Sequence, residues 1–223
     1  MIKVGNWGHG DIWRVVSGEF PSNAYICEIK NELNAVIIDG GLDPVFIDSC
    51  LDKLNLIPKA VLCTHGHFDH AGSSAYFEKK YKSNIYINKY DKKTLNTSNF
   101  LLMVLGIKSR IKIPKNVQWV IDGDVVKVND LVAKFHDFAG HTPGSSLIQI
   151  GNAIFTGDSI YAKGMGLSGL PGEDTELLKR NIKKHWKEFL TSEKYVLYPG
   201  HGEHIFARDL IHNNNALVNF IGH

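Results

Sequence analysis

The first sixty residues alternate between short apolar runs and turn-forming residues, a pattern typical of consecutive β-strands. Apolar positions dominate 12–16, 24–29 and 35–38, and polar or glycine-containing segments separate these three runs. The pattern predicts a meander of strands that opens the fold. A helix is predicted next, because Pro44 suits a first helical turn and apolar residues then recur at near-helical spacing until Pro58 ends the segment.

The remainder of the chain continues with alternating strands and helices. A strand over 60–63, a helix from about residue 71 to 81 and a strand over 84–88 predict a β-α-β unit. Further strands are predicted from residue 117 to the loop at Asp158, followed by a helix over about 175–190. One face of that helix is apolar and is predicted to face the core; it carries Leu178, Ile182, Trp186 and Phe189. Pattern alone therefore predicts a mixed α/β protein.

The segment from Thr64 to His70 concentrates candidate metal ligands. It holds His65, His67, Asp69 and His70 directly after the apolar run 60–63. Neutral imidazole and carboxylate are the ligands that zinc and similar divalent metals prefer. The segment therefore predicts a metal site at the end of a buried strand.

Three later motifs each place one further candidate ligand in a turn after a β-rich run. His141 lies in Gly-His-Thr-Pro-Gly-Ser, Asp158 in Thr-Gly-Asp-Ser, and His201 in Pro-Gly-His-Gly. We expect the four strand ends to meet at one edge of a sheet, where α/β proteins commonly place their active sites.

These motifs, in this order, resemble those of the metallo-β-lactamase-fold superfamily, and within it the glyoxalase II-like (hydroxyacylglutathione hydrolase-like) branch of binuclear hydrolases. The similarity begins at Ser22-Asn23-Ala24-Tyr25 and runs through Pro199-Gly200-His201-Gly202, so it covers most of the chain. It implies an α/β (α+β) fold, specifically a four-layer αββα sandwich of the metallo-β-lactamase type.

The resemblance also implies how the candidate ligands divide between two divalent metal ions. One metal would be bound by His65, His67 and His141. The second would be bound by Asp69, His70 and His201, with Asp158 bridging the two. Zinc is the expected metal, with iron and manganese as alternatives.

The implied reaction is hydrolysis of a small ester or thioester, in which a hydroxide shared by the two metals attacks the carbonyl carbon. Asp69 and Asp158 are candidates to move a proton, and Tyr161 is a candidate to donate a hydrogen bond to the developing negative charge. A lactonase of the same fold is one alternative. A persulfide dioxygenase, with a single iron on His65, His141 and Asp158, is another.

The chain departs from the small glyoxalase-like relatives after Asp158. Those relatives commonly carry an Ile-Gly-Arg-Thr-Asp stretch where this chain has Met165-Gly166-Leu167-Ser168-Gly169. The resemblance therefore does not extend to glutathione recognition. Segment 99–114 is rich in apolar residues and occupies a position that often forms a wall over the metals. Part of this run is predicted to line an apolar substrate pocket, which truncation of Phe100 or Met103 would test; the run carries Phe100, Leu101, Leu102, Met103, Leu105 and Ile107.

Length and composition limit the remaining choices. A chain of 223 residues with 43% hydrophobic residues is predicted to form a single domain over 1–223. A formal charge of +2 provides no strong field, so neither a nucleic-acid nor a membrane partner is expected. The expected partner is a small-molecule substrate, bound by a monomer or homodimer. Three cysteines without metal-finger spacing and the absence of a secretion signal favour a cytoplasmic protein with reduced, buried thiols.

Overall fold

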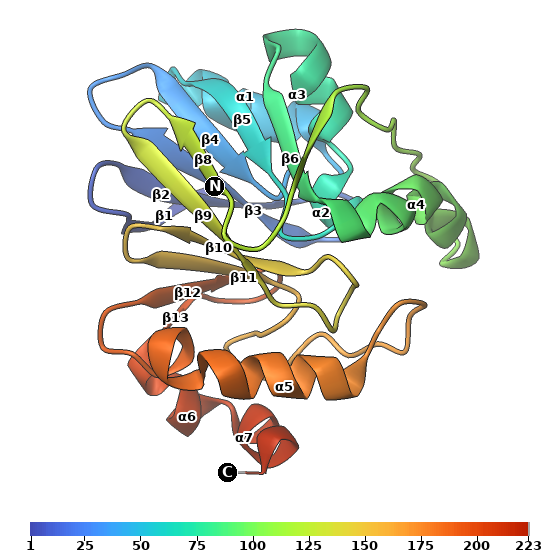
Figure 1. Cartoon of the computed structure of the whole chain (residues 1–223). Coiled ribbons are helices and arrows are strands. Elements are labelled where there is room, and N and C mark those ends of the chain that lie inside the picture. The colour runs from blue at the N-terminus through green and yellow to red at the C-terminus, as the bar shows by residue number, and fades with distance from the viewer. Residues whose placement is uncertain (223) are drawn as a thin grey trace.

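Two β-sheets stacked face to face form the centre of the protein. The computed structural model describes residues 1–222. In Figure 1 the layers run from α1 and α3 at the top, through the two sheets, to α5 at the bottom, so the αββα sandwich implied by the family resemblance is confirmed.

The first sheet has seven strands in sequence order. They are β1 (Ile2–Asn6), β2 (Asp11–Ser17), β3 (Ser22–Ile29), β4 (Asn34–Ile38), β5 (Ile57–Leu62), β6 (Asn84–Asn88) and β7 (Val117–Val120). The pairs from β1 to β4 are antiparallel and those from β4 to β7 are parallel. The predicted meander therefore exists, with β1 as an additional edge strand. The pattern does not reveal β1 because its residues are exposed or half-buried and show no alternation.

The second sheet has six strands in the order β13-β12-β11-β10-β9-β8. They are β8 (Val125–Val128), β9 (Leu131–Asp137), β10 (Ser146–Ile150), β11 (Ala153–Gly157), β12 (Val196–Pro199) and β13 (Ile205–Phe206). Only β11 and β12 pair in parallel, so the loops that follow these two strands leave the sheet at the same edge. Asp158 lies in one of these loops and His201 in the other.

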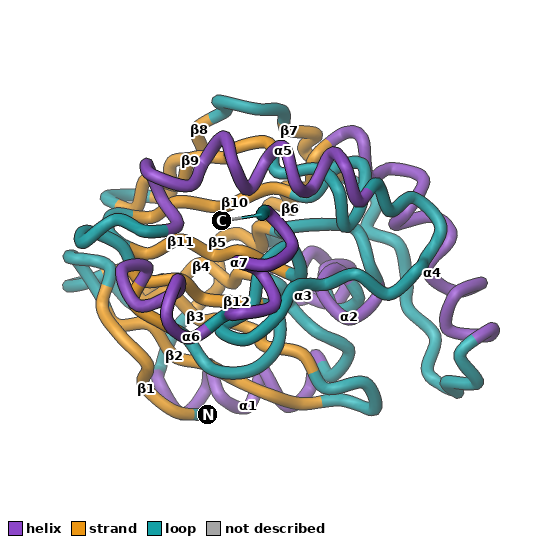
Figure 2. Tube along the Cα trace, turned by 90° about the horizontal axis from the view of Figure 1, so that it is seen from below, coloured by secondary structure: helices purple, strands orange, loops and turns teal. Residues whose placement is uncertain are grey.

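Helices cover the outer face of each sheet. They are α1 (Pro44–Leu54), α2 (Phe68–Ala71), α3 (Ser74–Tyr81), α4 (Lys92–Val104), α5 (Thr175–His185), α6 (Leu210–Asn213) and α7 (Asn215–Ile221). Figure 2 shows α5, α6 and α7 lying across the second sheet. The helix predicted over 175–190 changes at residue 186 to a π-helical turn, Trp186–Leu190. Its predicted apolar stripe, including Leu178 and Phe189, is buried against the second sheet as expected.

Three apolar clusters fill the spaces between the layers. The cluster between the sheets includes Tyr25, Val36, Phe135 and Phe155, and two others lie under the helices on either side. The three cysteines are unpaired and buried in these layers, as predicted. No helix within residues 1–222 is long and apolar enough to cross a membrane.

A buried carboxylate links α1 to α3 on the outside of the first sheet. Asp48 accepts hydrogen bonds from Tyr76 Oη at 2.8 Å and Tyr81 Oη at 2.6 Å, and it pairs with the Lys80 ammonium. Burial opposes ionisation of this carboxyl, but the hydrogen bonds from Lys80 and the two phenols outweigh it and hold the Asp48 pKa below its usual value of 3.8.

We expect Asp48→Asn to lower the free energy of unfolding by about 1–2 kcal/mol at pH 7, because it removes a charge-assisted network. A carboxyl whose pKa is lower in the folded state stabilises the protein above its unfolded-state pKa. The difference between wild type and variant should therefore persist down to about pH 4 and disappear as the pH falls further. Urea unfolding at several pH values measures it. Asp52→Asn, at an exposed position of the same helix, is the control and should change stability by less than about 0.5 kcal/mol.

Candidate metal centre

The seven predicted ligands come together at the open end of the sandwich, on loops from both sheets. His65 and His67 lie between β5 and α2, and Asp69 and His70 lie on α2 itself. The other three ligands follow strands of the second sheet: His141 follows β9, Asp158 follows β11 and His201 follows β12. The expectation that the four strand ends meet at one edge of a single sheet is therefore wrong. The strand β5 belongs to the first sheet, and only the stacking of the sheets brings its loop to the other three.

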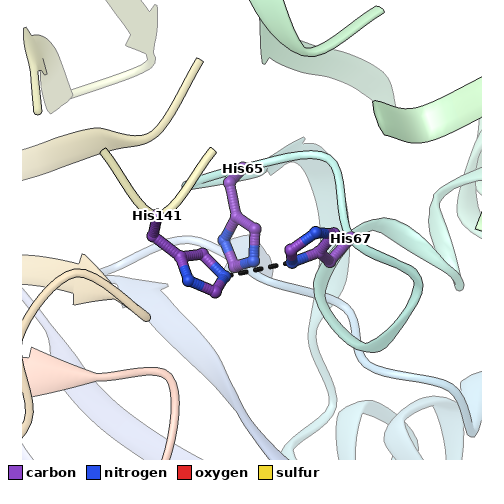
Figure 3. A group of neighbouring side chains, drawn as sticks. All are labelled: His65, His67 and His141. Carbon is purple, nitrogen blue, oxygen red and sulfur yellow. Dashed lines mark hydrogen bonds between the residues drawn. The ribbon is translucent and has the colours of Figure 1, made fainter. Parts of the chain in front are cut away.

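Three imidazoles form the first donor group. One ring nitrogen from each of His65, His67 and His141 lies within 4.8 Å of the others. Figure 3 shows the three rings facing one another, with His67 Nδ1 and His141 Nε2 3.0 Å apart. Such a set of three nitrogen donors matches the preference of zinc and similar metals.

Two carboxylates and two imidazoles form the second donor group, Asp69, His70, Asp158 and His201. His201 Nε2 lies 3.3 Å from Asp69 Oδ2 and 3.4 Å from Asp158 Oδ2. Asp158 Oδ2 is also 3.7 Å from His141 Nε2 in the first group. Asp158 therefore lies between the two groups.

Unpartnered buried atoms show that this arrangement fits metal ions. His65 Nε2 is buried and has no hydrogen-bond partner, and His70 Nε2 and Asp158 Oδ1 are buried and face each other at 3.2 Å without hydrogen-bond geometry. Buried polar atoms are almost always hydrogen-bonded, because an unmet donor or acceptor costs about 1–3 kcal/mol. These atoms, from the β5–α2 segment and from the loop after β11, are satisfied if cations bind between them.

The pKa shifts differ between the two groups. Burial, followed by neighbouring imidazoles, lowers the pKa of His65 well below 6.5 and that of His67 to about 4, so both are neutral ligands at pH 7. For His201 burial acts in the opposite direction, but hydrogen bonds with Asp158 and Asp69 raise the pKa to about 9. Without metal this second group holds protons, which metal binding must release.

Two aspartates that were not predicted from the sequence support the ligands. Asp39 Oδ2 lies 3.0 Å from His70 Nδ1, and the Asp39 carboxylate accepts hydrogen bonds from the amide and hydroxyl of Thr64. A carboxylate on the far nitrogen of a histidine orients the ring and fixes which nitrogen faces the metal. Asp39 directly follows the predicted strand 35–38 and precedes two glycines, a strand-end position that could have drawn attention to it.

Asp91 joins the two loops that carry the first donor group. Its carboxylate accepts hydrogen bonds from the amides of Gly66 and Gly144 at 2.7 Å each, and from the Thr142 hydroxyl at 2.7 Å. A Cβ on Gly66 or Gly144 would lie within 3.0 Å of atoms of Asp91. The close approach of these loops therefore depends on both glycines. Nothing in the sequence around Asp91 signals this role.

We expect Asp91→Asn to destabilise the protein by about 2–4 kcal/mol, because an amide cannot accept from every donor that the carboxylate serves. Metal affinity should fall as the two loops separate. Thermal unfolding and metal titration test both effects. Thr94→Ala, which removes one 3.2 Å hydrogen bond to the same carboxylate, is the matched control. If Asp91→Asn is no more destabilising than this control, the cross-linking role is wrong.

A cavity of about 530 Å³ opens above the donors. Tyr161 lines it, with its ring centroid 5.9 Å from that of His201. Burial and the negative charge of Asp158 raise the pKa of the Tyr161 phenol, which therefore keeps its proton. Lys163 is exposed and lies against a separate hollow lined by His204 and Phe206. His204 stacks on Tyr198 and is not part of either donor group.

Part of the apolar run in segment 99–114 lines the cavity, as predicted. Leu101 and Leu105 line the cavity. Phe100 and Met103 are 64% and 56% exposed and do not reach it. The phase of α4 decides this: Leu101 and the C-terminal cap residue Leu105 are four positions apart and share a face that Phe100 and Met103 do not.

Known proteins are similar to this chain over most of its length. The sequence profile of the metallo-beta-lactamase superfamily matches residues 17–201, which include all seven candidate ligands. An uncharacterized protein of Mycobacterium leprae is 30% identical over 199 residues, covering 83% of this chain and 88% of the relative. The hydroxyacylglutathione hydrolase GloC of Haemophilus influenzae is 26% identical over 177 residues, covering 78% and 82%.

The protein is also similar to a solved structure, that of TTHA1623 in a di-iron-bound form. The TM-score is 0.80 at 25% sequence identity, and the match covers 91% of this chain and 98% of the other. The fold, the matched profile and the candidate metal ligands from both sheets all indicate the same family. The chain belongs to the metallo-beta-lactamase superfamily, and its relatives include the hydroxyacylglutathione hydrolase GloC.

Proposed function

We propose that this protein is a hydrolase that holds two divalent metal ions and cleaves a small ester or thioester. Zinc is the proposed metal. The observation that carries the proposal is the position of Asp158 between the two donor groups, 3.4 Å from His201 and 3.7 Å from His141. The similarity to GloC, a hydroxyacylglutathione hydrolase, supports the same reaction class.

In this proposal His65, His67 and His141 hold one metal, Asp69, His70 and His201 hold the other, and Asp158 is shared. When bound, such a pair polarises a carbonyl oxygen and lowers the pKa of water to about 7. Asp39 and Thr64 keep the His70 ring in place by the hydrogen bonds described above. The ligand set is thereby preorganised before substrate arrives.

The protein's own side chains then handle the proton and the developing charge. Asp158 and Asp69, two carboxylates of the second donor group, would take the proton of the attacking water and return it to an alkoxide leaving group. A thiolate, whose conjugate acid has a pKa near 8.5, leaves without that help. The neutral Tyr161 phenol lines the cavity and can donate a hydrogen bond to the tetrahedral oxyanion.

Metal analysis and a substrate panel test the proposed function. Protein purified without chelator should contain about two zinc per chain and should hydrolyse thioesters in preference to phosphodiesters and persulfides. Homoserine lactones in the same panel distinguish a lactonase. One iron per chain together with oxygen consumption on a persulfide would overturn hydrolysis in favour of the dioxygenase alternative.

Tyr161→Phe should lower kcat by about 100-fold, the usual effect of removing one donor to an oxyanion. The metal content should be unchanged, because the phenol is not in either donor group. Steady-state kinetics and metal quantification measure the two quantities. Tyr90→Phe, at a position that is 61% exposed, is the control. Unaltered kcat in Tyr161→Phe would exclude the phenol from the reaction.

A further inference from the structure

The cavity above the donors has two chemically different parts. Its floor carries the donors His67, Asp69, His141, Asp158 and His201, together with Tyr161. Its walls come from three separate segments: the turn between β2 and β3, the region from α2 to α4, and the loop after Asp158. The wall side chains are nearly all apolar: Phe20, Pro21, Phe68, Leu101, Leu105, Met165, Leu167 and Leu170.

The walls provide no partner for a charged or polar substrate group. Among the described residues that line the cavity there is no lysine, arginine, asparagine or glutamine. The one polar wall side chain is Ser168, and its hydroxyl already donates to Glu173 at 2.7 Å. A polar group placed against these walls would lose water without gaining a hydrogen bond, which is unfavourable.

The apolar wall starts next to the donors and leads away from them. The Phe20 ring packs edge-on against both His201 and Phe68, with centroid distances of 6.2 and 5.4 Å. Phe68 in turn belongs to a cluster that includes Leu101 and Leu102 of α4. A continuous apolar path therefore runs from a donor histidine to α4, the helix seen at the right of Figure 1.

From these contacts we infer that the substrate carries an unbranched or lightly branched aliphatic acyl chain without a charged end. The inference rests on the proposed function, which places the reacting carbonyl at the donors. The acyl chain beyond the carbonyl then lies against Phe20 and Phe68 and reaches Leu101 and Leu105. Burial of each further methylene should strengthen binding by about two- to fourfold until the wall ends.

Methyl ketones test the inference by binding alone, because they contain the carbonyl and the chain but no leaving group. With the metal-loaded protein, the Kd measured by calorimetry should fall about two- to fourfold per methylene from 2-butanone to 2-octanone. A matched pair tests polarity: 5-hydroxy-2-pentanone should bind about tenfold more weakly than 2-hexanone, which has a methyl group in place of the hydroxyl. Equal Kd values along the series, or within the pair, would overturn the inference.

Two variants test whether the acyl chain of the substrate reaches the C-terminal end of α4. Leu105 lines the cavity and is 45% exposed, whereas its neighbour Val104 is 62% exposed and lies outside it. Leu105→Asn should weaken 2-octanone binding by about fivefold and leave 2-butanone within about twofold, because only the longer chain reaches this position. Val104→Asn should change neither. Equal effects of the two variants on 2-octanone would contradict the placement.

Kinetics separate this inference from the proposed function. Thioesters of N-acetylcysteamine with acetyl to octanoyl chains should show kcat/KM values that rise in parallel with ketone affinity. If ketone affinity depends on chain length but no thioester or ester is hydrolysed, the apolar site stands and hydrolysis is wrong. If neither the rate of thioester hydrolysis nor the affinity for ketones depends on chain length, hydrolysis stands and the aliphatic substrate is wrong.

Discussion

Replacing Asp158 by alanine should abolish binding of the metal pair and lower kcat/KM by more than about 100-fold. The carboxylate approaches histidines of both donor groups, His141 in the first and His201 in the second. Replacements that only orient a ligand typically cost about 10–100-fold in affinity or activity, so loss of a shared ligand should cost more. Metal per chain by mass spectrometry, with kcat/KM on a thioester, measures the effect.

Asp158→Ala should stay folded, because the side chain lies at the open end of the sandwich and outside the three apolar clusters. Circular dichroism and thermal unfolding check this. The control is Asp130→Ala at an exposed turn position after β8, which should retain metal and activity. Full turnover in Asp158→Ala would contradict both the shared ligand and the hydrolytic mechanism.

Gly200→Ala should impair the metal centre almost as severely as Asp158→Ala, although it removes no ligand. A Cβ at this position would lie 2.2 Å from Asp158 Oδ1 and 2.5 Å from His70 Cε1, far inside contact distance. The backbone has little freedom to retreat, because Gly200 N donates to Gly157 O at 2.7 Å and Gly200 O accepts from Asn23 N at 2.7 Å. The ligands must move instead, and a displacement of about 1 Å can cost about 100-fold in rate.

Metal stoichiometry and kcat/KM of Gly200→Ala should therefore both fall, the latter by about 100-fold. Gly202→Ala separates crowding from backbone strain. Gly202 has a φ of +80° but no atom within 4 Å of an added Cβ. This variant should lose about 1–2 kcal/mol of stability yet keep its metals and activity. Equal loss of metal in both variants would show that loop strain, and not contact with Asp158, is responsible.

The sequence predicted much of the secondary structure because local patterns carry that information. The helix from residue 175 was predicted because its apolar stripe repeats with helical spacing, and the structure buries that stripe against the second sheet. The edge strand β1 was not predicted. Its exposed and half-buried residues carry no alternation, since pairing with β2 rather than burial of one face holds it in place.

The supporting residues of the site could not be predicted in the same way. Asp39 and Asp91 are at least 25 positions along the chain from the groups of the ligand-bearing loops that they bind. No local pattern marks a carboxylate that will accept hydrogen bonds from distant loops. The wall residues Leu101 and Leu105 also depended on the structure, because the choice among neighbouring apolar residues of one helix is made by the orientation in which that helix packs.

The sequence by itself determined the set of donors, since imidazole and carboxylate side chains in four motifs define which ions can bind, whatever the fold. Tertiary structure decided how close these donors lie to one another, with Asp158 within 3.7 Å of a histidine in each group, and that an apolar cavity lies above them. The physical reason is that coordination chemistry belongs to individual side chains. Distances between side chains on different loops are set by the stacking of two sheets, whose contacts are distant in sequence.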